Sequence, residues 1–514
     1  MEKLSDRLNR LSYSKTFVMT NKAREMKSQG IDVISLTLGE PDFDVPDNIK
    51  QAAIDAIHQN YSHYSPVTGF LELREAVCKK LKRDNNLDYK PNQICVSNGA
   101  KQSIFNVLAS VVNDGDEVIL PTPYWVSYDE MVKIRRTIHE NPELGDEEIE
   151  TSKLIKKFLA ENGIEFFEII NTGVVATIYN DKENMENKTV ATRADIDALP
   201  IFEENEVEYK SKNIGKMHAC GHDAHTTIQL GVAKILADNK NKWHGTVRFF
   251  FQPAEETTGG ADRMIKNGAL KFENDTNRKI DAFFALHMAP EIELGKIGIK
   301  YGKAHASSAR IHLTINGTSA HAALPHKGVD AILIGAKVME FLQSIVSRRI
   351  DPREESVITI GAFNGGFADN VVCDKVEMKG TARTMSEETR TFIIETLEKY
   401  LPKFVESLGG TINVDIKRGY APVINDEEMT KKVENNIVDL YGENALELIK
   451  QPRMDVEDVS YFLNEIPGCF FRLGTRVEEK GLIYDLHHPK FNIDEESLKI
   501  GMGLQLKNIL EYLK

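Results

Sequence analysis

The chain has 514 residues, of which 41% are hydrophobic and 28% charged, which is the composition of an ordinary globular protein with material for about three domains. The formal net charge of -14 argues against a nucleic-acid-binding surface. The first residues lack the apolar core of a signal peptide, and no stretch is apolar over the width of a bilayer, so we expect no membrane partner. The five cysteines lie far apart and do not form a disulfide pattern, so we expect a cytoplasmic protein.

Residues 1–131 contain a candidate phosphate-binding turn at residues 98–102, which opens a predicted helix. A plain helix cap is the simpler interpretation of this turn alone. Together with residues 34–43, 64–69 and 121–125, however, it resembles the N-terminal third of a class I aminotransferase of the aspartate aminotransferase type. In that family the turn matching Gly99-Ala100-Lys101 contacts the phosphate of pyridoxal phosphate, and the aromatic residue matching Trp125 stacks on the cofactor ring.

The aminotransferase resemblance stops at about residue 131. The rest of the sequence shows neither the Schiff-base lysine in a Ser-rich loop nor the aspartate that pairs with the pyridinium nitrogen, and pyridoxal chemistry needs both. We therefore expect neither bound pyridoxal phosphate nor transamination, and a pyridoxal-phosphate-dependent aminotransferase is kept only as an alternative. Residues 128–136 join the two parts without a Gly/Ser/Pro linker, which suggests a join made by recombination or by faulty gene assembly. An inactive fusion protein is therefore a further alternative.

The densest group of potential ligands is the run Met-His-Ala-Cys-Gly-His-Asp-Ala-His at residues 217–225. A polar loop that is merely His-rich is the alternative to a metal site. Gly221 lets the backbone turn tightly, so Cys220 and His222 can approach one point. The run therefore predicts part of a metal site.

Further candidate ligands follow strand-like runs later in the chain. One run ends in Glu255-Glu256, a second ends in His287, and the segment Leu486-His487-His488-Pro489 adds two imidazoles. Ligands at the ends of successive buried strands are typical of active sites in α/β enzymes.

Residues 132–303 and 416–514 alternate helical and strand-like patterns, which predicts an α/β catalytic domain with a covered sheet. Between them, residues 304–415 read as a small α+β sandwich with a polar loop that contains His321. Such an inserted unit often dimerises through its helices or its sheet edge, so we expect a homodimer.

Six motifs carry a specific resemblance over residues 132–514: residues 134–145, 193–200, 217–225, 252–256, 317–323 and 486–489. They resemble the amidohydrolase branch of the aminoacylase/carboxypeptidase metallopeptidase family, which includes hippurate hydrolases, N-acyl-amino-acid amidohydrolases and plant auxin-conjugate hydrolases. The resemblance implies a di-metal peptidase-like α/β domain with an inserted α+β dimerisation (satellite) domain. It also implies metal-dependent hydrolysis of the amide bond of N-acyl amino acids or related conjugates.

Carried over by motif, the ligands of two divalent ions are five residues: Cys220, His222, Glu256, His287 and His487. Cys220 could bridge the ions, and a thiolate favours Mn, Zn, Co or Ni over Mg or Ca. The resemblance selects His487 over His488, because the family's ligand is followed by one residue and then Pro.

The same resemblance implies that Glu255 is the general base and that His321 reaches the partner subunit's site, where it stabilises the oxyanion. Adjacent side chains of an extended strand point in opposite directions, so only irregular backbone could aim both Glu255 and Glu256 into one site. Three further carboxylates are expected to be supporting groups: Asp195, Asp197 and Asp223. Val459 departs from the family pattern, which commonly has an aromatic residue there, and this leaves the shape of the pocket open.

Overall fold

The computed structural model describes residues 43–61, 65–97, 128–181, 187–272 and 277–514, with Met26, His63 and Ser103 as isolated positions. The chain divides into two units, Met1–Thr122 and Pro123–Lys514. The turn at residues 98–102 and Trp125 lie outside the described residues. No helix in the described ranges combines the length and apolarity that crossing a membrane requires.

The larger unit is built on a mixed eight-stranded sheet with the order β1-β2-β4-β3-β5-β14-β6-β13. Its strands are β1 (Glu165–Ile169), β2 (Gly173–Asn180), β3 (Thr189–Asp195), β4 (Gly245–Gln252), β5 (Ala282–Glu293), β6 (Ile297–Ile299), β13 (Leu446–Leu448) and β14 (Gly468–Arg476). The central pairs β4–β3, β3–β5 and β5–β14 are parallel. The carboxyl ends of β3 and β4 therefore lie side by side.

Both faces of this sheet are buried. Along β4, Phe249 and Phe251 enter one hydrophobic core, whereas Phe250 between them enters another. Five helices pack on the first face: α6 (Tyr128–Glu140), α7 (Ile149–Glu161), α8 (His222–Asp238), α12 (Glu427–Tyr441) and α14 (Glu496–Leu513). The short helices α9 (Gly260–Lys266) and α13 (Ser460–Glu465) cover the other. This arrangement confirms the α/β fold class expected from the sequence.

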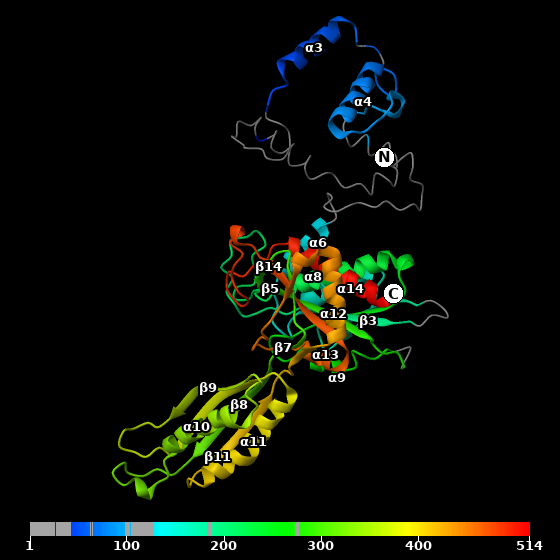
Figure 1. Ribbon diagram of the computed structural model, residues 1–514. Coiled ribbons are helices and arrows are strands. Elements are labelled where there is room, and N and C mark those ends of the chain that lie inside the picture. Colours follow the sequence, from blue (N-terminus) through cyan, green and yellow to red (C-terminus); the bar gives the residue numbers. More distant parts are fainter. Residues whose placement is uncertain are drawn as a thin grey trace, which may run out of the picture. The chain divides into compact units, whose positions relative to one another are not determined.

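A second sheet is antiparallel, with the order β11-β8-β10-β9. It consists of β8 (Ser307–Asn316), β9 (Ser356–Gly365), β10 (Lys375–Thr384) and β11 (Thr411–Arg418). The helices α10 (Ala331–Arg349) and α11 (Glu387–Glu406) pack on one face and enclose a separate core (Figure 1). The short pair β7 (Gly302–His305) and β12 (Val423–Asn425) lies where the chain enters and leaves this sheet.

The described part of the N-terminal unit contains α3 (Asp47–His58) and α4 (Leu71–Asn85). Neither helix buries a residue, although both carry apolar side chains. Ile57 is 70% exposed and Val67 is 97% exposed. The described residues of this unit therefore lack a hydrophobic core of their own.

Candidate metal centre and active site

The loop from Met217 to Gly221 leads directly into α8, whose first residue is His222. Gly221 adopts a left-handed conformation with φ 88°, and a Cβ at this position would lie 2.8 Å from the side chain of Met288. A residue with a side chain would be disfavoured here, because it would meet both backbone strain and a clash. The glycine thus lets Cys220 and His222 lie on either side of a tight turn.

Three histidines whose rings lie beside one another, His222, His225 and His287, differ in whether a ring nitrogen is left for a ligand. His222 uses Nδ1 in contacts with the carbonyl oxygen (2.9 Å) and a carboxylate oxygen (3.1 Å) of Asp197. His287 likewise uses Nδ1, which donates to the carbonyl of Met288 at 2.8 Å. In both residues the Nδ1 contact fixes the orientation of the ring and leaves Nε2 facing the centre, where that of His287 lies 3.5 Å from the sulfur of Cys220.

His225 has both ring nitrogens engaged. Its Nδ1 lies 2.5 Å from a carboxylate oxygen of Asp195, and its Nε2 accepts the backbone N–H of Met288 at 2.9 Å. Although it is the third imidazole of the His-rich run, His225 therefore supports the site and does not offer it a free nitrogen.

The five predicted ligands come together. The potential ligand atoms of Cys220, His222 and His287 all lie within 4.8 Å of one another, and so do those of Cys220, Glu256 and His487. Cys220 belongs to both groups, which is the arrangement that a bridging ligand between two ions requires. His488 is directed elsewhere: its Nδ1 accepts the N–H of Lys490, and its ring stacks on Tyr484.

The irregular backbone required at Glu255 and Glu256 is present. Ala254, directly before them, has φ 55°, a left-handed conformation that is uncommon for a residue other than glycine. As a result the carboxylates of both glutamates reach to within 4.8 Å of each other and of His222. Two neighbouring side chains therefore enter one site.

The centre is rich in buried carboxylates. The fully buried Arg193 contacts Asp195, Glu457 and Asp458 at 2.6 to 2.9 Å. Within the described ranges no lysine or arginine forms an ion pair with Glu255 or Glu256. Burial and the neighbouring carboxylates, that of Glu457 first, raise the pKa of Glu255 well above its usual value. Burial likewise raises the pKa of the Cys220 thiol, with Glu256 adding to the effect.

A cleft of about 820 Å³ opens at Glu255, Glu256 and His487. Its other lining residues include four cations from strands of the antiparallel sheet: Arg310, Arg383, Lys417 and Arg418. The cleft therefore combines the potential metal ligands at one side with positive charge at the other.

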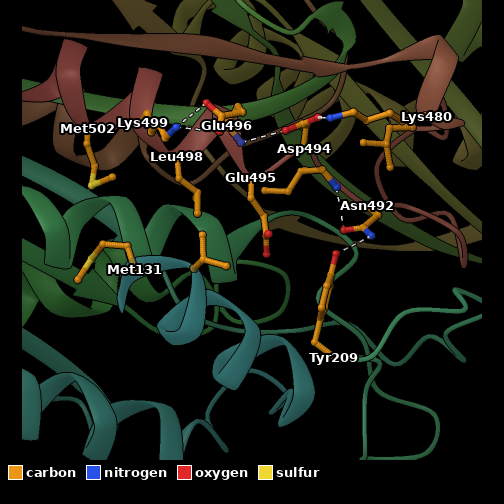
Figure 2. Close-up of a pocket in the computed structure, with 13 residues that line it drawn as sticks. Met131, Tyr209, Lys480, Asn492, Asp494, Glu495, Glu496, Leu498, Lys499 and Met502 are labelled. Atoms are coloured by element: carbon orange, nitrogen blue, oxygen red, sulfur yellow. Dashed lines mark hydrogen bonds and ion pairs between the residues drawn. The ribbon is translucent and has the colours of Figure 1, made fainter. Parts of the chain in front are cut away.

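The structure does not bring His321 to this cleft. It lies in an exposed loop after β8, where its Nδ1 accepts the N–H of Ala323. Figure 2 shows a second pocket, of about 450 Å³, which has other lining residues. Met131, Tyr209 and the segment around Glu495 line it, and none of the predicted site residues does.

Several residues around the centre have no role that the sequence motifs assign. Glu457 lies 4.0 Å from Nε2 of His287, and the phenol of Tyr420 donates to the backbone carbonyl of Glu255. The adjacent acids Glu457 and Asp458 were a visible signal in the sequence. No local sequence pattern identifies Tyr420 or the cleft cations as site residues, because their positions depend on the packing of distant segments.

Comparison with known families places both parts of the chain. Residues 191–511 match peptidase family M20/M25/M40, which covers more than half of the chain, and residues 31–140 match aminotransferase class I and II. The chain belongs to peptidase family M20/M25/M40. Both resemblances expected from the sequence are thereby confirmed.

Among relatives, an IAA-amino acid hydrolase (ILR1-like 2) of Arabidopsis thaliana is 38% identical, over 75% of this chain and 86% of its own length. An N-acetyl-L-cysteine deacetylase of Bacillus subtilis is 39% identical, over 72% of this chain and 85% of its own length. Both are named for action on amino acids joined to another group.

Among solved structures, a protein from methicillin-resistant Staphylococcus aureus described as an aminohydrolase is 36% identical, with a TM-score of 0.69 over 75% of this chain and 97% of its own. The Bacillus subtilis YXEP protein, described as a dinuclear metal binding peptidase of the M20 family, is 30% identical. It has a TM-score of 0.63 over 75% of this chain and 98% of its own.

Proposed function

We propose that this protein is a metal-dependent amidohydrolase that cleaves the amide bond of N-acyl amino acids or related conjugates, releasing a carboxylic acid and an amino acid. The observation that carries the proposal is the convergence of the five ligand side chains around Cys220. The names of the Arabidopsis and Bacillus relatives support the substrate class.

The residues at the centre fit a pair of cations. The Nε2 atom of His222 is buried and forms no hydrogen bond within the described ranges, although Asp195 and Asp197 lie close by. An excess of buried carboxylates is costly unless cations neutralise it. Cys220, His222, Glu256, His287 and His487 would hold two divalent ions, and the thiolate favours Mn, Zn, Co or Ni. Bound there, the ions would supply Lewis acidity to polarise the amide carbonyl and acidify water.

Glu255 is the proposed general base. Its carboxylate faces His222 and Glu256 and lines the cleft, so it can reach a water molecule that attacks a bound amide. It would take a proton from this water and deliver it to the departing nitrogen. The cleft cations, Arg383 in particular, would bind the carboxylate of the amino-acid part.

We further propose that residues 132–303 and 416–514 form the catalytic domain, that residues 304–415 form a satellite domain through which two chains pair, and that the protein is cytoplasmic. Apolar side chains are exposed near the start of α10, in β9 and just after β9: Ile332, Leu333, Phe363 and Phe367. A dimer interface would cover them. His321, exposed in the same domain, would then complete the partner subunit's site by stabilising the oxyanion.

Hydrolysis of a panel of N-acetyl and N-benzoyl amino acids by the protein and by Glu255→Gln tests the function. We expect Glu255→Gln to lower kcat by about 10²-fold to 10⁴-fold, the usual contribution of a general base, without loss of bound metal. Glu434→Gln, a carboxylate on α12 bonded to Tyr301 and outside the cleft, is the matched control. Normal turnover by Glu255→Gln, or no hydrolysis of any member of the panel by the metal-loaded protein, would refute the proposal.

A further inference from the structure

The left-handed conformation of Ala254 needs an explanation, because it directs two neighbouring glutamates into one site. A side chain makes this conformation unfavourable, so the surroundings must stabilise it. The backbone N–H of Ala254 is buried and donates to Oε1 of Glu148 at 2.8 Å. A buried N–H without an acceptor is costly, so this carboxylate favours the observed turn over alternatives that would withdraw the N–H from it.

Glu148 is a fully buried acid whose carboxylate bonds to segments distant in the sequence. It occupies the residue before α7, yet its carboxylate does not cap that helix. Its second oxygen accepts the hydroxyl of Thr172 at 2.7 Å, at the start of β2. One carboxylate oxygen therefore bonds to Thr172 and the other to Ala254.

The same turn is anchored at two further points. The N–H of Glu256 donates to Asp197 at 3.0 Å, and Tyr420 donates to the carbonyl of Glu255. The loop before Glu148 also approaches the turn closely, since a Cβ on Gly145 would lie 3.0 Å from the Cα of Ala254. Among the side chains that anchor the turn, Glu148 is the one bonded directly to the left-handed residue, whose carbonyl also accepts the N–H groups of Gly259 and Gly260 at 3.1 and 3.3 Å.

We propose that Glu148 is a positioning residue: its carboxylate holds Ala254 in the left-handed conformation that aims Glu255 and Glu256 into the same centre. The inference rests on the proposed function, because it assigns Glu148 to the reaction through Glu255. What matters is the reach of an acceptor oxygen to the N–H of Ala254. Removing the negative charge is expected to matter less.

The test ranks two variants that separate reach from charge. Glu148→Asp keeps the charge but shortens the side chain by one methylene. We expect kcat to fall about tenfold to a hundredfold, because a misplacement of about 1 Å can cost 10²-fold, while KM and metal content stay within about twofold. Glu148→Gln loses the charge but keeps an acceptor oxygen at the same reach, so kcat should fall by no more than about threefold.

Rescue at Ala254 distinguishes positioning from general destabilisation. Glycine adopts positive φ readily, so adding Ala254→Gly to Glu148→Asp should recover a large part of the lost kcat. Glu143→Asp is the matched control, because the Glu143 carboxylate also accepts two backbone N–H groups nearby, those of Glu150 and Thr151 at the start of α7. It should lower the Tm but leave kcat within about twofold, since the turn at Ala254 does not depend on it.

Two further measurements keep the outcome decisive. If Glu148→Asp does not fold, Ala254→Val, in which a β-branched side chain resists positive φ, must lower kcat with metal retained. Hydrogen exchange in a peptide spanning residues 252–258 must be faster in Glu148→Asp than in the natural protein. This measurement does not depend on enzymatic activity. It therefore separates failure of this inference from failure of the proposed function. The proposal is overturned if Glu148→Gln is more damaging than Glu148→Asp, if Ala254→Gly rescues nothing, or if exchange at the turn is unchanged.

Discussion

The chemistry of single residues at the centre depends on which atoms are already engaged. Asp197 and the carbonyl of Met288 engage Nδ1 of His222 and His287, which leaves Nε2 of each for a ligand. His225, three positions after His222 in the same motif, has no free nitrogen. Within the His-rich run, residue type alone does not distinguish His222 from His225. The family motif selects His222, and the tertiary contacts show that His225 has no ring nitrogen to offer.

Arg383 provides a test of substrate recognition at this scale. A half-buried guanidinium in the cleft should bind the substrate carboxylate with a charge-assisted hydrogen bond of about 1.5 to 3 kcal/mol, so Arg383→Ala should raise KM by about tenfold to a hundredfold. The effect should vanish for an N-acyl amino acid amide, which lacks the carboxylate. Arg353→Ala, an exposed guanidinium paired with Asp351, is the control. An equal loss with both substrates would contradict this role.

At the scale of helices and strands, hydrophobic periodicity predicted much of the fold. The sequence pattern predicts a helix at residues 329–348, where the structure has α10 (Ala331–Arg349), and a strand at residues 376–383, where it has β10 (Lys375–Thr384). The pattern also predicts a helix at residues 225–237 after the His-rich run. This helix begins at His222, three residues earlier, because the left-handed Gly221 already turns the chain into it. The motifs also supplied the ligand candidates that the structure brings together.

What the sequence could not supply was how these elements are held. The turn at Ala254 is stabilised by Glu148, more than a hundred positions earlier, and the cleft cations come from a separate sheet. Such contacts follow from packing between distant segments, which no local pattern encodes.

The inserted sheet and helices provide a test of pairing between two chains. If His321 acts in the partner subunit's site, His321→Ala and Glu255→Ala should each be inactive alone. A mixed dimer of the two holds one complete site, so equal amounts, reassociated at random, should recover about a quarter of the natural activity. Activity is measured after mild dissociation and mixing. Absence of recovery in a mixture shown to contain mixed dimers would contradict a role for His321 across the interface.

At the scale of the whole molecule, the described parts of the two units differ in how much apolar surface they bury. The helices α3 and α4 of the first unit bury no residue, whereas the second unit has extended cores on both faces of its main sheet. All predicted site residues lie in the second unit.

Removal of residues 1–127 tests this division. The cut keeps α6 whole, because Met131 packs in the main core and Arg135 pairs with Asp223 at 2.6 Å. We expect the shortened protein to retain its kcat, KM and thermal transition, measured by hydrolysis and circular dichroism. A loss of turnover in a folded, metal-loaded product would show that the N-terminal unit takes part in function.

The central claim is that Cys220 joins two ligand groups that hold a pair of cations. Metal content per chain, determined by mass spectrometry after dialysis against Mn²⁺ or Zn²⁺ and removal of free ion, tests it most directly. The account predicts two ions per chain in the natural protein and at most one in Cys220→Ala. No stoichiometric metal in the natural protein, or two ions retained by Cys220→Ala, would contradict it.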